Sequence, residues 1–120
     1  MRVVYCAESR SLAAMEVLVG LDERERLLEI PWVCIPVTLP MALIEKAAQV
    51  PSEWRQYPQN ATSQAFGAGW VQAQRSVALR VPSAVVPGEF NYLLNPAHPD
   101  FKRLKIGKPE PFSFDPRLGK

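Results

Sequence analysis

Hydrophobic residues in this chain fall into short runs, separated by polar residues and prolines, and these runs predict the secondary structure. The first run, Val3 to Ala7, has the composition of a buried β-strand. Ser9 or Ser11 can cap the helix that follows, and the residues from Leu12 to Gly20 are apolar on nearly every side. We therefore expect a buried strand followed by a deeply packed helix.

The middle of the chain alternates between candidate strands and candidate helices. Leu27 to Ile35 has strand composition, and Met41 to Ala48 follows a proline as a short helix candidate. The polar segment from Val50 to Asn60 predicts an irregular loop. A further helix is expected from Thr62, which can cap it, to about Gln74.

Proline limits the length of the elements in the last third of the chain, because seven of the twelve prolines follow residue 81. Proline lacks the N–H group that a central strand needs, so strands must end where prolines occur. The pattern predicts short strands at Ser76–Val81, Val85–Val86, Tyr92–Leu94 and Pro111–Asp115, and a helical turn at Pro99–Leu104. This irregular mixture indicates one mixed α/β (α+β) domain over residues 1–120.

Charge and cysteine content narrow the classes of function. The net charge is only +2, without the clustered basic patch of a nucleic-acid-binding domain. Cys6 and Cys34 lie in apolar runs, which favours free thiols, and two cysteines with one histidine lack the spacing of a zinc site. No apolar run has the length of a transmembrane helix, and no signal-peptide pattern is present. We expect a soluble cytoplasmic protein.

Four residues are candidates for chemistry, each with a structural alternative. Glu16 lies in an apolar helix, where a carboxylate is usually paired, neutral or at a cleft, unless it reaches solvent at the helix edge. Tyr5 is either a core tyrosine or a ring that stacks on a flat ligand. Ser83 lacks the G-x-S-x-G context of a hydrolase nucleophile. His98 could serve a serine or cysteine as a base, but a solvated loop histidine is favoured.

Polar side chains also stand at the ends of predicted strands. Ser83, Asn91 and Asn95 each adjoin an apolar run in the segment from Arg80 to Phe101. Proteins of the α/β class tend to place site residues at such positions, because strands hold them rigidly beside a cleft. The sequence thus predicts a polar site at this end of the sheet.

Three segments of the chain resemble the RES-domain family. They are VVYCAESRSLAAMEVLV, LRVPSAVVPGEFNYLLNPAHPDF and PFSFDPRL, and the resemblance extends from about Val3 to Leu118. It implies a fold similar to ADP-ribosyltransferase toxins, with short mixed strands flanked by helices. It also implies a toxin of a type II toxin–antitoxin pair that acts on NAD, by hydrolysis, phosphorolysis or transfer of ADP-ribose to a protein. The implied partner is a helix-turn-helix antitoxin.

The resemblance also implies roles for individual residues. Glu16 and Ser83 match the family's catalytic glutamate and serine, and Tyr5 matches a tyrosine of the same NAD pocket. Glu16 would stabilise the positive charge that develops on the ribose, Tyr5 would stack on nicotinamide, and Ser83 would hold the ribose or amide. Asn91 could add a contact to NAD at its strand end. No metal is required.

The family's arginine has no counterpart in this sequence. In the family it lies in a strand and loop upstream of the Tyr5 strand, and Arg2 does not stand in that context. We expect that N-terminal segment to be missing here. One alternative function is therefore a truncated, catalytically inactive remnant that only binds its antitoxin, and another is a serine or cysteine hydrolase that uses His98.

Overall fold

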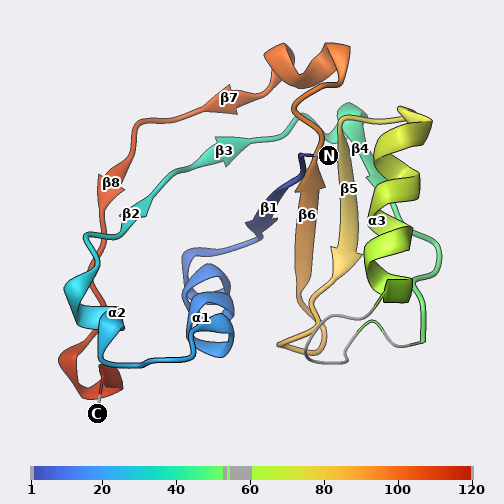
Figure 1. Cartoon of the computed structure of the whole chain (residues 1–120). Helices are drawn as coiled ribbons and strands as arrows, with labels where there is room; N and C mark the ends of the chain where they lie inside the picture. Colours follow the sequence, from blue (N-terminus) through green and yellow to red (C-terminus); the bar gives the residue numbers. More distant parts are fainter. Residues whose placement is uncertain (1, 53, 55–60, 120) are drawn as a thin grey trace.

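A four-stranded sheet is the central element of the computed structural model, which describes residues 2–52, 54 and 61–119 (Figure 1). The order of the strands is β1-β6-β5-β4. Antiparallel pairing joins β1 to β6 and β6 to β5, whereas β4 runs parallel to β5. The strands are β1 (Val4–Ala7), β4 (Ile44–Lys46), β5 (Ala78–Pro82) and β6 (Phe90–Leu94). The expected mixed α/β class is confirmed.

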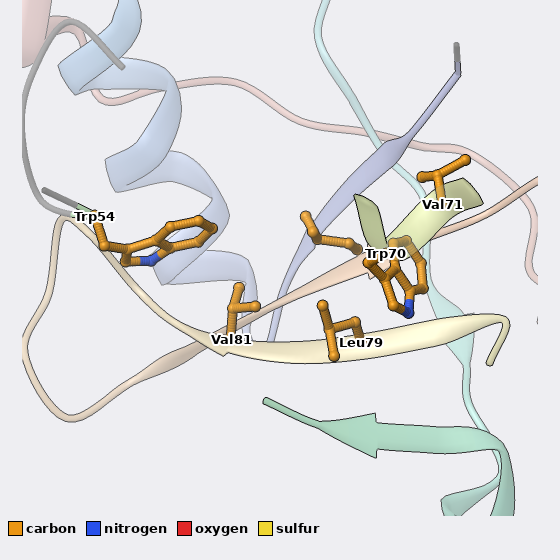
Figure 2. Close-up of a cluster of buried hydrophobic side chains, with 6 residues drawn as sticks. Trp54, Trp70, Val71, Leu79 and Val81 are labelled. Atoms are coloured by element: carbon orange, nitrogen blue, oxygen red, sulfur yellow. The ribbon is translucent and has the colours of Figure 1, made fainter. Parts of the chain in front are cut away.

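Helix α3 (Ala61–Ala73) covers one face of this sheet, close to the predicted range of Thr62 to Gln74. Leu79 and Leu93 are partners in the β5–β6 ladder, and Val81 lies on the same face because side chains alternate along a strand. The core on this face is drawn in Figure 2 and consists of Trp54, Trp70, Val71, Leu79, Val81 and Leu93. It holds α3 against the sheet through apolar burial.

Two short strand pairs form an arm that curves away from the sheet (Figure 1). Within the arm, β2 (Val33–Cys34) pairs with β8 (Glu110–Pro111), and β3 (Val37–Thr38) pairs with β7 (Lys105–Ile106), both antiparallel. The arm makes the molecule extended. The radius of gyration of the whole molecule is 15.1 Å, whereas a compact chain of this length would have about 13.6 Å.

The first strand and helix form where the pattern predicted them, but they are less buried than expected. Helix α1 spans Arg10–Gly20, and Ser9 caps it by accepting a hydrogen bond from the Leu12 N–H at 3.1 Å. Only Leu12 in this helix is buried. Val4 and Tyr5 are 40% and 50% exposed. Deep packing was a wrong expectation, because β1 is an edge strand and α1 lies beside that edge rather than between two layers.

The strand predicted over Leu27 to Ile35 is wrong for its first half. Residues Arg26–Glu29 form one helical turn, α2, which buries Leu27. The indole N–H of Trp32 donates to the Leu27 carbonyl at 2.7 Å and secures this turn. Trp32 follows the turn within the same apolar segment, and the strand composition of that segment did not reveal this side-chain bond.

The helix predicted over Met41 to Ala48 is also wrong. A short 3-10 helix, η1 (Met41–Leu43), leads directly into β4. Residues of β4 pair with β5, with Ile44 opposite Ala78 and Lys46 opposite Arg80. Because this parallel pairing joins segments far apart in the sequence, a local pattern cannot reveal it.

In the last third of the chain the prolines determine where strands and helical turns begin and end. The helical turn is confirmed as η2 (Pro99–Arg103), whereas Val85–Val86 forms a turn instead of a strand. The expected last strand is reduced to β8, and η3 (Pro116–Gly119) follows it. Both cysteines are free, as predicted. Most of the predicted loop from Val50 to Asn60 lies outside the described residues.

Within the described residues, no helix has the length and apolar character needed to cross a membrane.

Candidate active site

The structure brings Tyr5, Glu16 and Ser83 together beside the α3 face of the sheet. Tyr5 is the ladder partner of Leu93, so its side chain is on the face that carries the α3 core. Ser83 directly follows β5 and continues the alternation of Val81. Glu16 reaches the same place from α1, since its carboxylate accepts a hydrogen bond from Ser83.

The hydroxyl group of Ser83 is fully engaged inside the protein. It accepts hydrogen bonds from the backbone N–H groups of Val85 and Val86, at 3.1 and 3.0 Å, and donates to Glu16 Oε1 at 3.3 Å. A hydroxyl offers one donor and two acceptor positions, and these three bonds use them all. Ser83 is 1% exposed. The arrangement suits a serine that orients a carboxylate rather than one that attacks a substrate.

Tyr5 and Glu16 form the accessible part of this cluster. Glu16 is half-buried, and Ser83 is the only hydrogen-bond partner of its carboxylate among the described residues. Burial of the phenol, and secondly the negative charge of Glu16, raise the pKa of Tyr5 to about 12. The phenol therefore keeps its proton and can donate a hydrogen bond throughout the physiological range.

Spectroscopic titration of Tyr5 tests whether its phenol is buried beside the Glu16 carboxylate. We expect one tyrosine, absent from a Tyr5→Phe variant, to ionise near pH 12 instead of 10. Replacing Glu16 by glutamine should lower that pKa, yet leave it above 10 because burial is the larger cause. The phenol loses its proton near pH 10 in the unfolded chain and near pH 12 in the folded chain. The stability that neutral Tyr5 contributes to the fold is therefore complete below pH 10 and is lost between pH 10 and 12. Ionisation of Tyr5 near pH 10 would contradict the geometry.

The two asparagines have different surroundings. Asn91 stands between Ala7 and Val81 in the ladder and is fully buried. Its Nδ2 donates to the Cys6 carbonyl at 3.3 Å, while its Oδ1 has no hydrogen-bond partner among the described residues. Asn95 is occupied within the fold, because its side chain donates to the Val71 carbonyl and accepts from the Ala97 N–H. Of the two, only Asn91 adjoins the candidate site.

Trp54 is a neighbour of the site that the sequence pattern did not indicate. Its indole N–H donates to the Pro82 carbonyl at 2.7 Å, next to Ser83, and its ring packs edge-on against Phe66 of α3. Figure 2 shows the ring near Val81, which belongs to the same apolar cluster. The available signal was a tryptophan in an otherwise polar segment, which is unusual because tryptophan buries a large apolar area.

His98 is not the solvated loop histidine that the sequence favoured. Its Nδ1 accepts a hydrogen bond from the Asp100 N–H at 3.0 Å, so Nε2 carries the proton and donates to the Gln74 carbonyl at 3.1 Å. Gln74 has a left-handed backbone conformation, with φ of 53°, at the end of α3. The histidine thereby joins η2 to the end of α3. Its ring is occupied by these bonds rather than directed at Ser83 or Cys34.

A cavity of about 700 Å³ lies next to this cluster rather than on it. Tyr5 lines it, but Glu16 and Ser83 do not. Its other walls include Cys6 and Tyr92, which alternate onto the opposite face of the sheet, and apolar residues of the arm. We place the chemistry at Glu16 instead, because the carboxylate and serine that line the cavity are engaged elsewhere: Glu8 accepts a hydrogen bond from the Phe90 N–H, and Ser9 caps α1. Residues 2–52, 54 and 61–119 contain no group of three or more side chains that could hold a metal ion.

Comparison with known families gives a match over nearly the whole chain. The profile of the RES domain matches residues 1–115. That range includes Tyr5, Glu16, Ser83 and Asn91.

Three curated relatives are identical to this chain at more than a third of the aligned positions. The Prs ADP-ribosylating toxin of Sphingobium sp. is 40% identical over 119 residues, which cover 97% of this chain and 74% of that toxin. Toxin Res of Yersinia enterocolitica is 37% identical, with 96% and 76% covered. Toxin Res of Photorhabdus laumondii is 36% identical, with 98% and 76% covered.

Proposed function

The chain belongs to the RES domain family, and from that premise we propose that it is a toxin that cleaves the bond between nicotinamide and ribose in NAD. The relative from Sphingobium is named an ADP-ribosylating toxin, a reaction that uses NAD as the donor. The observation that carries the proposal is the hydrogen bond from Ser83 to Glu16 beside the exposed Tyr5 ring. It presents a carboxylate and a protonated phenol at one accessible place.

Glu16 provides the charge that this reaction requires. Loss of nicotinamide leaves positive charge on the ribose in a transition state that resembles an oxocarbenium ion. A carboxylate that is held in place stabilises this charge without having to reorient, and it can also accept a hydrogen bond from the 2′-hydroxyl group. Because Ser83 occupies Oε1, the second carboxylate oxygen is available for the ribose.

The other residues of the cluster position Glu16 and the substrate. Ser83 is itself oriented by two backbone N–H groups, so it fixes Glu16 from a rigid turn. The half-exposed ring of Tyr5 offers a flat surface for nicotinamide, and its retained proton offers a donor. Asn91 supports the site from beneath, because its bond to the Cys6 carbonyl fixes β1 next to Tyr5.

The family's toxins also suggest a protein partner. Two relatives are named Toxin Res, and we propose that this chain is neutralised by an antitoxin of the helix-turn-helix type encoded beside it. We further propose that both proteins act in the cytoplasm, where NAD is available. A strain that carries the toxin gene alone should then lose NAD and stop growing.

Product analysis of purified protein with NAD tests the proposed reaction. We expect free nicotinamide to accumulate in proportion to the enzyme added. Free ADP-ribose would identify water as the acceptor, ADP-ribose 1-phosphate would identify phosphate, and a labelled protein would identify a side chain. A correctly folded chain that releases no nicotinamide with water, phosphate or bacterial extract as the acceptor would overturn the proposal. Calorimetry with NAD would then separate loss of chemistry from loss of binding.

A further inference from the structure

Trp54 makes the hydrogen bond that strand β4 is too short to make. β4 ends at Lys46, and the Ala47 N–H donates to the Arg80 carbonyl of β5 at 3.0 Å. Because backbone groups alternate in direction along a strand, the next β5 carbonyl on this side is that of Pro82. The indole N–H of Trp54 donates to this carbonyl at 2.7 Å, beyond the end of β4.

The peptide unit between Pro82 and Ser83 is therefore held on both sides. Its carbonyl group, from Pro82, accepts the bond from Trp54, and its N–H group, from Ser83, donates to the Glu89 carbonyl at 2.8 Å. A peptide unit is planar, so bonds at its two opposite sides prevent it from rotating about the strand axis. Such a rotation would swing the Cα–Cβ bond of Ser83 and displace its hydroxyl group.

The bond from Ser83 to Glu16 is sensitive to such a displacement. Ser83 Oγ and Glu16 Oε1 are 3.3 Å apart, whereas hydrogen bonds between a hydroxyl group and an oxygen acceptor usually measure about 2.5–3.0 Å. A small movement of the hydroxyl group away from the carboxylate would therefore break this bond. The position of Glu16 thus depends on how firmly the Pro82–Ser83 peptide is held.

The core fixes the direction of the Trp54 indole. Trp54 is 6% exposed and belongs to the apolar cluster between the sheet and α3 (Figure 2). Its ring centroid lies 5.6 Å from that of Phe66 of α3, with the two rings edge to face, and its backbone N–H donates to the Pro51 carbonyl at 2.9 Å. A ring packed in this way holds its N–H toward Pro82 without having to be ordered first.

We propose that Trp54 is a positioning residue of the reaction: it holds the Pro82–Ser83 peptide, and Ser83 in turn holds Glu16 where positive charge develops on the ribose. The inference rests on the proposed cleavage of NAD, and it assigns Trp54 no contact with the substrate. It also connects the α3 core to the reaction, because the side chains that orient Trp54 are those that hold α3 against the sheet.

Replacing Trp54 by phenylalanine tests this role. The variant keeps a buried ring but loses the N–H donor, and we expect kcat for nicotinamide release to fall by about tenfold with little change in KM, because a displaced Glu16 acts in the transition state. Trp70→Phe is the matched control, since Trp70 belongs to the same core but its indole N–H donates to Ser76, before the start of β5, at 2.9 Å. Its kcat should stay that of the unaltered chain. Equal kcat for the two variants would overturn the proposal.

A double-mutant cycle tests whether Trp54 acts through Ser83. Ser83→Ala removes the hydroxyl group, and with it the bond by which Trp54 is proposed to influence Glu16. In that background we expect Trp54→Phe to lower kcat by less than about twofold, because two changes in one series of contacts are not additive. A loss as large as in the unaltered background would mean that Trp54 acts by another route, and would overturn the proposal.

Titration of Tyr5 gives a readout that does not depend on catalysis. The charge of Glu16 contributes to the raised pKa of Tyr5, which is about 12. Trp54→Phe should release the carboxylate toward solvent and so lower the pKa of Tyr5, as Glu16→Gln does, whereas Trp70→Phe should leave it near 12. A chain that shows this shift but releases no nicotinamide would overturn the NAD reaction and keep Trp54 as the residue that positions Glu16. A pKa of Tyr5 that stays near 12 in Trp54→Phe would overturn that assignment.

Circular dichroism verifies that each variant is folded. If Trp54→Phe does not fold, benzothienylalanine takes its place at position 54, and at position 70 for the control. This residue keeps the bicyclic shape of tryptophan and replaces the indole N–H by sulfur, so it removes only the donor. The same losses in kcat and the same shift in the pKa of Tyr5 are expected of it, and their absence would overturn the proposal.

Discussion

Replacement of Glu16 by glutamine is expected to lower the rate of NAD cleavage by at least about 100-fold, the usual cost of removing an electrostatic partner of the transition state. Glutamine has the same shape, and its Oε1 can still accept the hydrogen bond from Ser83. The loss therefore reports the missing negative charge rather than a collapsed site. Release of nicotinamide under saturating NAD measures it, and the effect should fall mainly on kcat, because the charge acts in the transition state.

Glu23→Gln is the matched control for this experiment. Glu23 is exposed in the turn between α1 and α2, and within the described residues only its backbone carbonyl takes part in a hydrogen bond. Its replacement removes the same charge and should leave the rate unchanged. Equal rates for the Glu16→Gln variant and the unaltered chain would show that the reaction, if present, does not depend on this carboxylate.

Replacement of Leu79 by alanine is expected to lower the free energy of unfolding by about 3 kcal/mol. Leu79 is 1% exposed and lies in the core between β5 and α3, with Trp70 and Val71 of α3 and Leu93 of β6 in the same cluster (Figure 2). The change removes buried apolar area and leaves a cavity, which rigid neighbours fill only in part. For a chain of 120 residues this corresponds to a fall in Tm of roughly 12 °C.

Met41→Ala is the control for the core substitution. Met41 is 84% exposed in η1, so its replacement should change the free energy of unfolding by less than about 0.5 kcal/mol. Urea unfolding followed by circular dichroism measures both variants. Similar midpoints for the two would mean that the α3 core does not hold the sheet as described.

Residue types and motifs indicate the members of the candidate site, whereas their geometry depends on the tertiary structure. Glu16 stood out as a carboxylate in an apolar helix, and Ser83 stood at the end of a predicted strand. The structure places them 3.3 Å apart at Ser83 Oγ and Glu16 Oε1, although 67 residues separate them in the chain. The part played by Trp54 was not foreseen, because its bond to the Pro82 carbonyl is a long-range contact.

The fold was predictable wherever local chemistry decides the backbone. Serine at the start of α1 and the prolines around η2 each have local effects, and these elements formed at or near the expected positions. Failures occurred where pairing with a distant segment outweighed local preference. The residues of β4 became a strand because β5 lies beside them, and α2 packs against η3 from the other end of the chain.

The sequence by itself determined the class of the fold, the capping of α1, the strands β5 and β6 and the family to which the chain belongs. Each of these rests on neighbouring residues or on motifs, which are local properties of the chain. Only the tertiary structure decided that β1 is an exposed edge, that His98 secures the end of α3, and that the Ser83 hydroxyl holds Glu16. These features depend on which distant segments meet, and that is decided by the burial of the whole apolar core rather than by any single segment.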